Sequence, residues 1–66
     1  MHILVNGERR EAADGMTVGD LLRTLDHAGR RLAVEVNADI VPRSEHEKRV
    51  LRDGDRVEVV HAIGGG

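Results

Sequence analysis

Apolar residues follow two different periods along this chain. They alternate with polar residues over residues 1–5, 32–36 and 56–61, which is the period of a half-buried strand. Between the first two of these runs they recur at intervals of three and four, which places them on one face of a helix. The residues with this helical spacing are Val18, Leu21, Leu22 and Leu25. The pattern therefore predicts strands on both sides of one amphipathic helix.

Turn-forming residues separate the predicted strands. Asn6-Gly7 tolerates positive φ at both positions and joins the first strand to a return strand over residues 8–13. This return strand is highly charged, which suits a strand at the edge of a sheet. Asn37-Ala38-Asp39 is the next predicted turn, and the short strand Ile40-Val41 follows it until a proline ends it. Asp53-Gly54-Asp55 is the turn before the last strand.

Capping residues indicate where the helices begin and end. Thr17 is the expected N-cap of the amphipathic helix, and Asp20 three residues later completes a pattern that resembles a capping box. Gly29 is the expected C′ residue. A single further helical turn is expected at residues 44–49, capped by its first residue together with Glu47.

The elements follow the order strand, strand, helix, strand, short strand, strand. One amphipathic helix has a single apolar face, which must pack across one sheet. A crossover through a helix also lets a later strand run parallel to the first. We therefore expect an α+β protein with the β-grasp (ubiquitin-like) fold, in which one helix packs across a mixed sheet of four to five strands. Residues 1–63 would form this domain, and residues 64–66 a flexible glycine tail.

The predicted core is entirely aliphatic because the chain contains no Phe, Trp or Tyr. Its members are the inward-facing residues of the predicted strands and helix. They are Ile3, Val5, Val18, Leu21, Leu22, Leu25, Val34, Val36, Ile40, Leu51, Val57 and Val59.

Composition narrows the classes of function. A chain of 66 residues buries only about 60% of its unfolded surface, which favours a carrier, adaptor or subunit over an enzyme. The absence of cysteine excludes disulfides and thiolate ligands, and the four histidines lack the H-x-x-x-H spacing, so no metal or bound cofactor is expected. The absence of aromatic residues and a net charge of −2 argue against nucleic-acid binding. No membrane span or signal peptide is recognised, so the cytoplasm is the expected location.

Three glycines, Gly64, Gly65 and Gly66, form the C-terminal end of the sequence. Because glycine has no Cβ atom, this segment would be mobile and thin enough to thread into a narrow channel of another protein. An α-carboxyl has an ordinary pKa of about 3.5, so that of Gly66 would be an anion at neutral pH. Such an anion can attack the α-phosphate of ATP, and a sulfur nucleophile can convert the acyl-adenylate into a thiocarboxylate. The chain has no G-x-x-x-x-G-K-[ST] loop, so a partner would have to perform the activation.

Four stretches of the sequence resemble the ThiS family of thiamine-biosynthesis sulfur carriers. They are the opening residues 1–7, the internal stretch Val36-Asn37-Ala38-Asp39-Ile40-Val41-Pro42-Arg43, the turn at residues 51–55, and the final Gly65-Gly66. The internal octet and the diglycine end are the most specific of these, and the resemblance covers essentially the whole chain.

The resemblance implies a set of partners and a role for Gly66. An E1-like adenylyltransferase would use ATP to activate Gly66, and a sulfur donor such as a cysteine desulfurase would supply the sulfur of a Gly66 thiocarboxylate. Thiazole synthase would then take this sulfur for the thiazole ring of thiamine. Two alternatives use the same tail: the small subunit of molybdopterin synthase and a ubiquitin-type protein modifier. A β-grasp interaction module without tail chemistry is a third alternative.

A docking surface is expected on the sheet face opposite the helix. Leu4, Val60 and Ala62 should project from that face, and the first and last strands should be neighbours. Together with Ile63 these residues would form a small apolar patch near the root of the tail, against which the activating enzyme and the synthase would dock.

Overall fold

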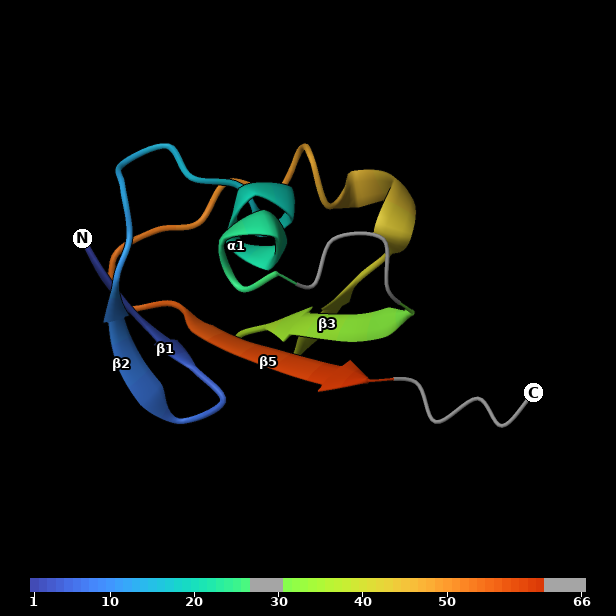
Figure 1. The fold of residues 1–66 in the computed structure, drawn as a ribbon, viewed down its shortest axis with the longest axis horizontal. Coiled ribbons are helices and arrows are strands. Elements are labelled where there is room, and N and C mark those ends of the chain that lie inside the picture. Colours follow the sequence, from blue (N-terminus) through green and yellow to red (C-terminus); the bar gives the residue numbers. More distant parts are fainter. Residues whose placement is uncertain (27–30, 62–66) are drawn as a thin grey trace.

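The computed structural model describes residues 1–26 and 31–61, and within them it contains one α-helix, one 3-10 helix and a five-stranded sheet (Figure 1). The α-helix lies across one face of the sheet (Figure 1). In chain order the elements are β1 (His2–Val5), β2 (Glu8–Glu11), α1 (Val18–Thr24), β3 (Leu32–Val36), β4 (Asp39–Val41), η1 (Arg43–Glu45) and β5 (Arg56–His61).

The last strand lies at the centre of the sheet, whose order is β2-β1-β5-β3-β4. β1 runs parallel to β5, with Leu4 opposite Arg56 and Val5 opposite Val57. The other neighbouring strands are antiparallel. A mixed sheet with one helix across it confirms the predicted β-grasp fold, and the parallel pairing of the first and last strands is confirmed with it.

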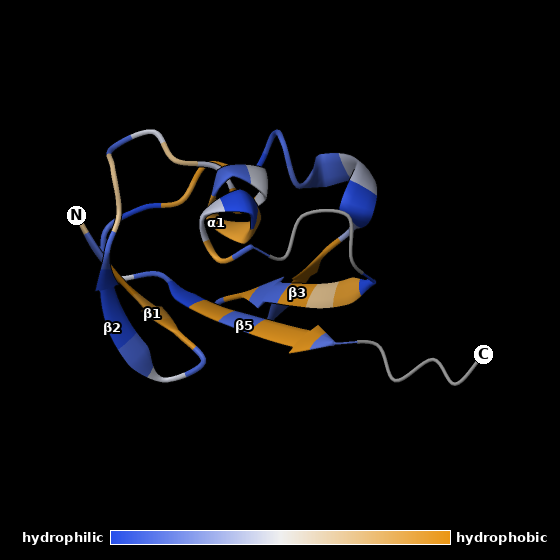
Figure 2. Ribbon diagram, viewed as in Figure 1, coloured by the Kyte–Doolittle hydropathy of each residue, from blue (hydrophilic) through white to orange (hydrophobic). Residues whose placement is uncertain are grey.

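The core lies between α1 and the sheet, and Figure 2 shows the apolar side of α1 turned toward the strands. Its buried members are Ile3, Val5, Ala12, Val18, Leu21, Leu22, Val34, Val36, Val41, Leu51, Val57 and Val59. Leu25, which was predicted to be buried, is only half-buried at the end of the helix and packs against this cluster. Ala12 was not predicted; its backbone bonds to that of Met1, and it lies on the same side of the sheet as Arg10, which is opposite the core residue Ile3.

The prediction that Ile40 belongs to the core is wrong, and the turn before it explains why. Asn37 and Ala38 have φ values of 52° and 72°, as a two-residue hairpin turn with two left-handed residues requires. This turn sets Val41 opposite Val34 and Ile40 opposite Glu35. Because neighbouring strand residues point to opposite faces, Val41 is 4% exposed in the core and Ile40 is 75% exposed on the outer face.

The N-terminus of α1 is held by its own cap and by the segment before β5. Thr17 and Asp20 form the predicted capping box: the Asp20 N–H donates to Thr17 Oγ1, and the Thr17 N–H donates to an Asp20 carboxylate oxygen, both at 3.1 Å. The N–H groups of Val18 and Gly19, the first two residues of α1, donate to the carbonyls of Arg49 and His46. The first turn of the helix is therefore fully bonded and fixed against residues 46–49.

The other end of α1 differs from the prediction. The helix ends at Thr24, and Asp26 adopts a left-handed conformation with φ 60° two residues later. Asp26 therefore occupies the position expected for a glycine, since Asp tolerates this region better than most residues do. Gly29, the predicted C′ residue, lies outside the described residues.

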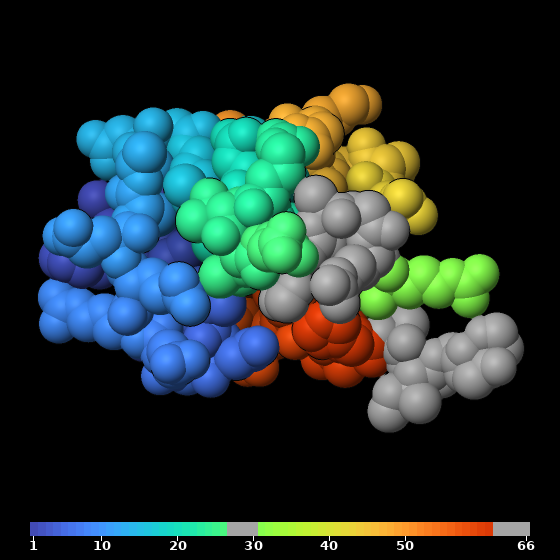
Figure 3. All heavy atoms as spheres, in the orientation of Figure 1, coloured from blue at the N-terminus to red at the C-terminus, as the bar shows by residue number. Residues whose placement is uncertain are grey.

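The predicted helical turn at residues 44–49 is a 3-10 helix that begins one residue earlier. Pro42 is its N-cap, and Ser44 does not cap it. Glu47, predicted to complete that cap, instead bonds to Arg23 on α1. A Cβ atom on Gly19 would overlap the Glu47 carboxylate, so a larger residue there would displace the side chain that bonds to Arg23. Figure 3 shows α1 and the segment before it on the upper side of the molecule, with β5 below α1.

Candidate functional site

The docking surface was predicted on the outer face of the sheet, which lies opposite α1 (Figure 1). Its residues alternate along each strand with the buried ones. They are His2 and Leu4 on β1, Arg9 and Glu11 on β2, Ala33 and Glu35 on β3, Ile40 on β4, and Arg56, Glu58 and Val60 on β5. We call this set the outer face.

Asn6 anchors the C-terminal half of β5. The chain turns away from the sheet after Val5, and Asn6 has a φ of 50°. Its Oδ1 accepts a hydrogen bond from the Val59 N–H at 2.8 Å, and its Nδ2 donates to the Val59 carbonyl at 3.2 Å. The side-chain amide thus replaces a backbone peptide and extends the ladder between β1 and β5 by one step.

Asn37 anchors the beginning of β5 from the opposite neighbouring strand. The Arg56 N–H donates to Asn37 Oδ1 at 3.0 Å, and the Asn37 N–H donates to the Arg56 carbonyl at 2.8 Å. Asn37 Nδ2 also donates to Asp55 Oδ1 at 2.9 Å. The predicted turn at Asn37 is confirmed, and Asn37 adopts the left-handed conformation. Asn6 and Asn37 thus bond to β5 from its two sides, at Val59 and Arg56, and its last residue, His61, is paired with Leu32 on β3.

The structure does not bring the predicted docking residues together. Leu4 is half-buried opposite Arg56, whereas Val60 is 58% exposed opposite Ala33. Four residues of extended strand, about 13 Å, separate the position of Arg56 from that of Val60. Ala62, Ile63, Gly64, Gly65 and Gly66 lie outside the described residues. Leu4 and Val60 therefore do not adjoin each other on the described outer face, and Val60 is the more exposed of the two. Because the predicted patch also includes Ala62 and Ile63, the docking surface as a whole stays a prediction.

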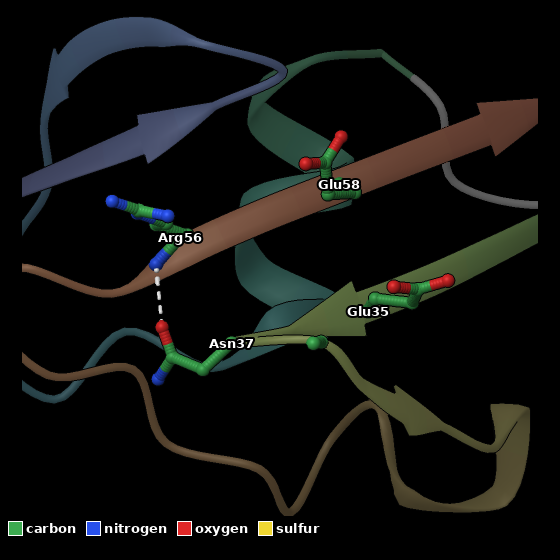
Figure 4. Close-up of a pocket in the computed structure, with 5 residues that line it drawn as sticks. Glu35, Asn37, Arg56 and Glu58 are labelled. Carbon is green, nitrogen blue, oxygen red and sulfur yellow. Dashed lines mark hydrogen bonds between the residues drawn. The ribbon is translucent and has the colours of Figure 1, made fainter.

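Two glutamates and an isoleucine on the outer face were missed by the sequence reasoning. Glu35 and Glu58 are directly opposite each other on β3 and β5, and Ile40 is opposite Glu35 on the other side. Glu35, Glu58 and Arg56 line a hollow of about 360 Å³ together with the Asn37-Ala38 turn (Figure 4). The sequence could have indicated that Ile40 and Glu35 are neighbours, because a two-residue hairpin turn at Asn37-Ala38 places them opposite each other.

The strongest electrostatic interactions lie elsewhere, between α1 and the segment that follows η1. Arg23 donates to Glu47 at 2.8 and 2.9 Å and to Asp20 at 2.6 Å. The bonds from Arg23 hold the pKa of Glu47 below its ordinary value, and those to Glu47 first and Asp20 second raise the pKa of Arg23. The backbone bond from Thr17 first, and then Arg23, lowers the pKa of Asp20. These groups join α1 to the segment that follows η1 and are not on the outer face.

Neither a metal centre nor a membrane segment was found in the part of the chain that the structure describes. Within residues 1–26 and 31–61, no group of three His, Asp or Glu side chains is placed to hold a metal ion. Of the histidines there, His2 lies 3.4 Å from a Glu11 oxygen, and buried His46 contacts the Val41 carbonyl at 3.1 Å. No helix in the described ranges is long and apolar enough to cross a membrane.

The sheet order, with the last strand at the centre, and the single helix across one face define a β-grasp (ubiquitin-like) domain (Figure 1). A model of the ThiS family matches residues 3–66. The chain is 36% identical over 66 residues to the sulfur carrier protein ThiS of Escherichia coli K12, with 100% of both chains covered. The chain belongs to the ThiS family.

Two further relatives add to this comparison. The crystal structure of the thiamine biosynthesis protein ThiS from Geobacter metallireducens matches with a TM-score of 0.86 and 32% identity, covering 100% of both chains. The chain is also 44% identical over 66 residues to a thiazole synthase of Paramagnetospirillum magneticum. It spans 20% of the length of that relative, and 20% of a second thiazole synthase, from Magnetococcus marinus.

Proposed function

We propose that this chain is a sulfur carrier protein of thiamine biosynthesis and that its cargo is attached to Gly66. The observation that carries the proposal is the similarity to the Escherichia coli sulfur carrier over the full length of both chains. The glycine end of the sequence and the anchoring of β5 are consistent with it. The carrier is a co-substrate that is loaded and unloaded, and it performs no catalysis itself.

The chemistry begins at the Gly66 carboxylate. One of its oxygens attacks the α-phosphorus of ATP in an E1-like adenylyltransferase, and pyrophosphate leaves. A sulfur nucleophile at the oxidation level of sulfide, derived from a donor such as a cysteine desulfurase, then attacks the acyl carbon, and AMP leaves. The resulting thiocarboxylate gives its sulfur to the acceptor in thiazole synthase, and an oxygen from that acceptor or from water takes its place on the acyl carbon, which regenerates the carboxylate. The location would be the cytoplasm.

The remaining chain positions the reactive end. Gly64 and Gly65 add no side chains, so they would pass through a narrow channel toward a partner's active site. Val60, Ala62 and Ile63 would supply apolar contacts next to that channel, and Leu4 a more distant contact. Asn6 and Asn37 bond to β5, so the segment that follows β5 would begin at a fixed position on the carrier.

Reconstituted thiazole synthesis tests this proposal. The intact chain, the adenylyltransferase, ATP, a sulfur donor and thiazole synthase are combined, and the thiazole product is measured. We expect deletion of Gly66 to abolish product formation while the circular dichroism spectrum stays unchanged. Product formation at the normal rate without Gly66 would refute the carrier role, and high-mass conjugates in cell extracts would favour the ubiquitin-type modifier instead.

A further inference from the structure

The turn between β1 and β2 contains a chemically reactive pair of residues. Asn6 and Gly7 form the two-residue turn of this hairpin, with φ values of 50° and 85°. Asparagine is a thermolabile residue, because its side-chain amide can be lost as ammonia. A following glycine obstructs this reaction least, since it has no Cβ atom beside the reacting backbone nitrogen. Asn6 is also exposed, so water reaches it.

The sequence contains only one other side-chain amide with which Asn6 can be compared. The chain has no glutamine, and its second asparagine is Asn37. Asn37 also has a positive φ and a side chain bonded at both ends, but the residue after it is Ala38. The Cβ atom of Ala38 crowds the backbone nitrogen that would have to react. Local sequence alone therefore makes Asn6 the more labile of the two amides, and Asn37 is an internal reference for it.

Deamidation of Asn6 requires no reactant other than water. The backbone nitrogen of Gly7 loses its proton and attacks the side-chain carbonyl carbon of Asn6. A new C–N bond closes a five-membered succinimide ring, the bond from the same carbon to the amide nitrogen breaks, and ammonia leaves with the proton. Water then opens the ring at either carbonyl carbon. The product carries an aspartate or an isoaspartate in place of the asparagine.

The fold holds the Asn6 amide away from the geometry of ring closure. Asn6 Oδ1 accepts a hydrogen bond from the Val59 N–H at 2.8 Å, and Nδ2 donates to the Val59 carbonyl at 3.2 Å. The side-chain carbon cannot swing to the Gly7 nitrogen while both bonds to β5 are made. Ring closure also rotates the peptide between Asn6 and Gly7 out of the orientation that it has in a turn with two left-handed residues.

We propose that Asn6 is a latent site of spontaneous deamidation, and that its two hydrogen bonds to Val59 suppress the reaction in the folded chain. The reaction proceeds only when the turn opens locally and both bonds break. Two such bonds correspond to a bias of about thirtyfold toward the closed turn. The inference goes beyond the proposed function, because it concerns the hairpin turn and involves neither the cargo nor a partner.

Either product of the reaction weakens the attachment of β5 to this turn. An aspartate keeps the oxygen that accepts from the Val59 N–H, but it places a carboxylate oxygen against the Val59 carbonyl, to which the amide of Asn6 donates. An isoaspartate runs the main chain through the former side chain, which lengthens the turn and moves the carboxylate away from Val59. A single deamidation event therefore loosens the last part of β5.

The test follows the intact mass of the full chain over time in mildly alkaline buffer, with and without guanidinium chloride at a denaturing concentration. Each deamidation raises the mass by about 1 Da, and fragmentation assigns the gain to Asn6 or Asn37. No other side-chain amide in the chain can give this signal. The matched control is Asn6→Asp, in which only Asn37 can gain the mass.

In the denatured chain we expect Asn6 to deamidate faster than Asn37, because glycine follows it. In the folded chain we expect deamidation at Asn6 to be about thirtyfold slower than in the denatured chain. The same rate at Asn6 in both conditions would overturn the inference, since the fold would then give no protection. A denatured chain in which Asn37 reacts first would also overturn it.

Hydrogen exchange at the Val59 amide tests whether these two bonds are what protects Asn6. Exchange and deamidation require the same opening, so both rates should rise in parallel as low concentrations of denaturant are added. Exchange that accelerates while deamidation does not would refute the role of the Val59 bonds. The deamidated chain, separated by ion exchange, should show faster exchange at Val59 and a lower thermal midpoint than the intact chain. Unchanged values for both would refute the predicted loosening of β5.

Discussion

Asn6 offers the sharpest test of how the end of β5 is held. Its side chain makes two hydrogen bonds to the Val59 backbone, at 2.8 and 3.2 Å, and its own φ is 50°. Asn6→Ala removes both bonds, which contribute about 1 kcal/mol each. It also forces alanine into the left-handed region at a cost of about 1 kcal/mol. The expected loss is therefore about 3 kcal/mol of unfolding free energy.

Two further substitutions divide this loss into its parts. Asn6→Gly removes the hydrogen bonds but accepts a positive φ, so its expected loss is about 2 kcal/mol. Asn6→Asp keeps the oxygen that accepts from the Val59 N–H and loses only the donor to the Val59 carbonyl, so it should lie between wild type and Asn6→Gly. A domain of this size has a total stability of roughly 3–10 kcal/mol, so even the milder losses are measurable.

Urea unfolding followed by far-ultraviolet circular dichroism measures these differences, since the chain has no aromatic residue for fluorescence. With a slope of about 1 kcal/mol per molar urea, Asn6→Ala should lower the midpoint by about 3 M and Asn6→Gly by about 2 M. Hydrogen exchange at the amide of Val59 should accelerate in both. If Asn6→Gly unfolds at the same urea concentration as wild type, the side-chain bonds to Val59 contribute nothing and the reasoning fails.

Three further predictions concern the packing of the two layers. Val41→Ala should cost about 2 kcal/mol in urea unfolding, whereas Ile40→Ala should change stability by less than about 0.5 kcal/mol; the reverse order would contradict the β4 register. Thr17→Ala should lower the free energy of unfolding by about 1 kcal/mol in the same assay, and an unchanged urea midpoint would show that the Thr17 cap does not stabilise the helix. The lowered pKa values of Asp20 and Glu47 mean that their stabilisation is present above their ordinary values of 3.8 and 4.5 and is lost as the pH falls through the folded-state values. Thermal unfolding from pH 6 to pH 2 should therefore show a smaller acid loss in Glu47→Gln than in wild type, and parallel curves would refute the assignment.

Much of the fold followed from local pattern. The helical spacing from Val18 to Leu22 and the capping box of Thr17 and Asp20 predicted α1 and its start, because both signals depend on residues within one or two turns. The alternation at Arg56–His61 predicted β5 with the bounds that the structure has. These elements are specified locally, and the single apolar face of α1 then leaves one sheet to pack against.

The errors arose where the alternation of apolar and polar residues within one strand does not decide the outcome. Ile40 and Val41 are both apolar, so alternation could not choose the buried one; the register imposed by the Asn37-Ala38 turn did. Glu47 was assigned to a cap because its partner Arg23 is 24 residues away in sequence. The separation of Leu4 from Val60 likewise depends on the parallel register of β1 and β5, which no local pattern reveals.

The central claim, that Gly66 carries sulfur as a thiocarboxylate, is tested most directly by intact mass spectrometry after incubation with ATP, the adenylyltransferase and a sulfur source. We expect a gain of about 16 Da, which oxidation of Met1 or Met16 would also give, so a thiol-alkylating reagent is applied before analysis. The chain has no cysteine, so an alkylated product must carry a thioacid, and fragmentation should place it on Gly66. Two outcomes would contradict the account. One is an unchanged mass although the adenylyltransferase is active on its own carrier, and the other is a mass gain in a product that the reagent does not alkylate.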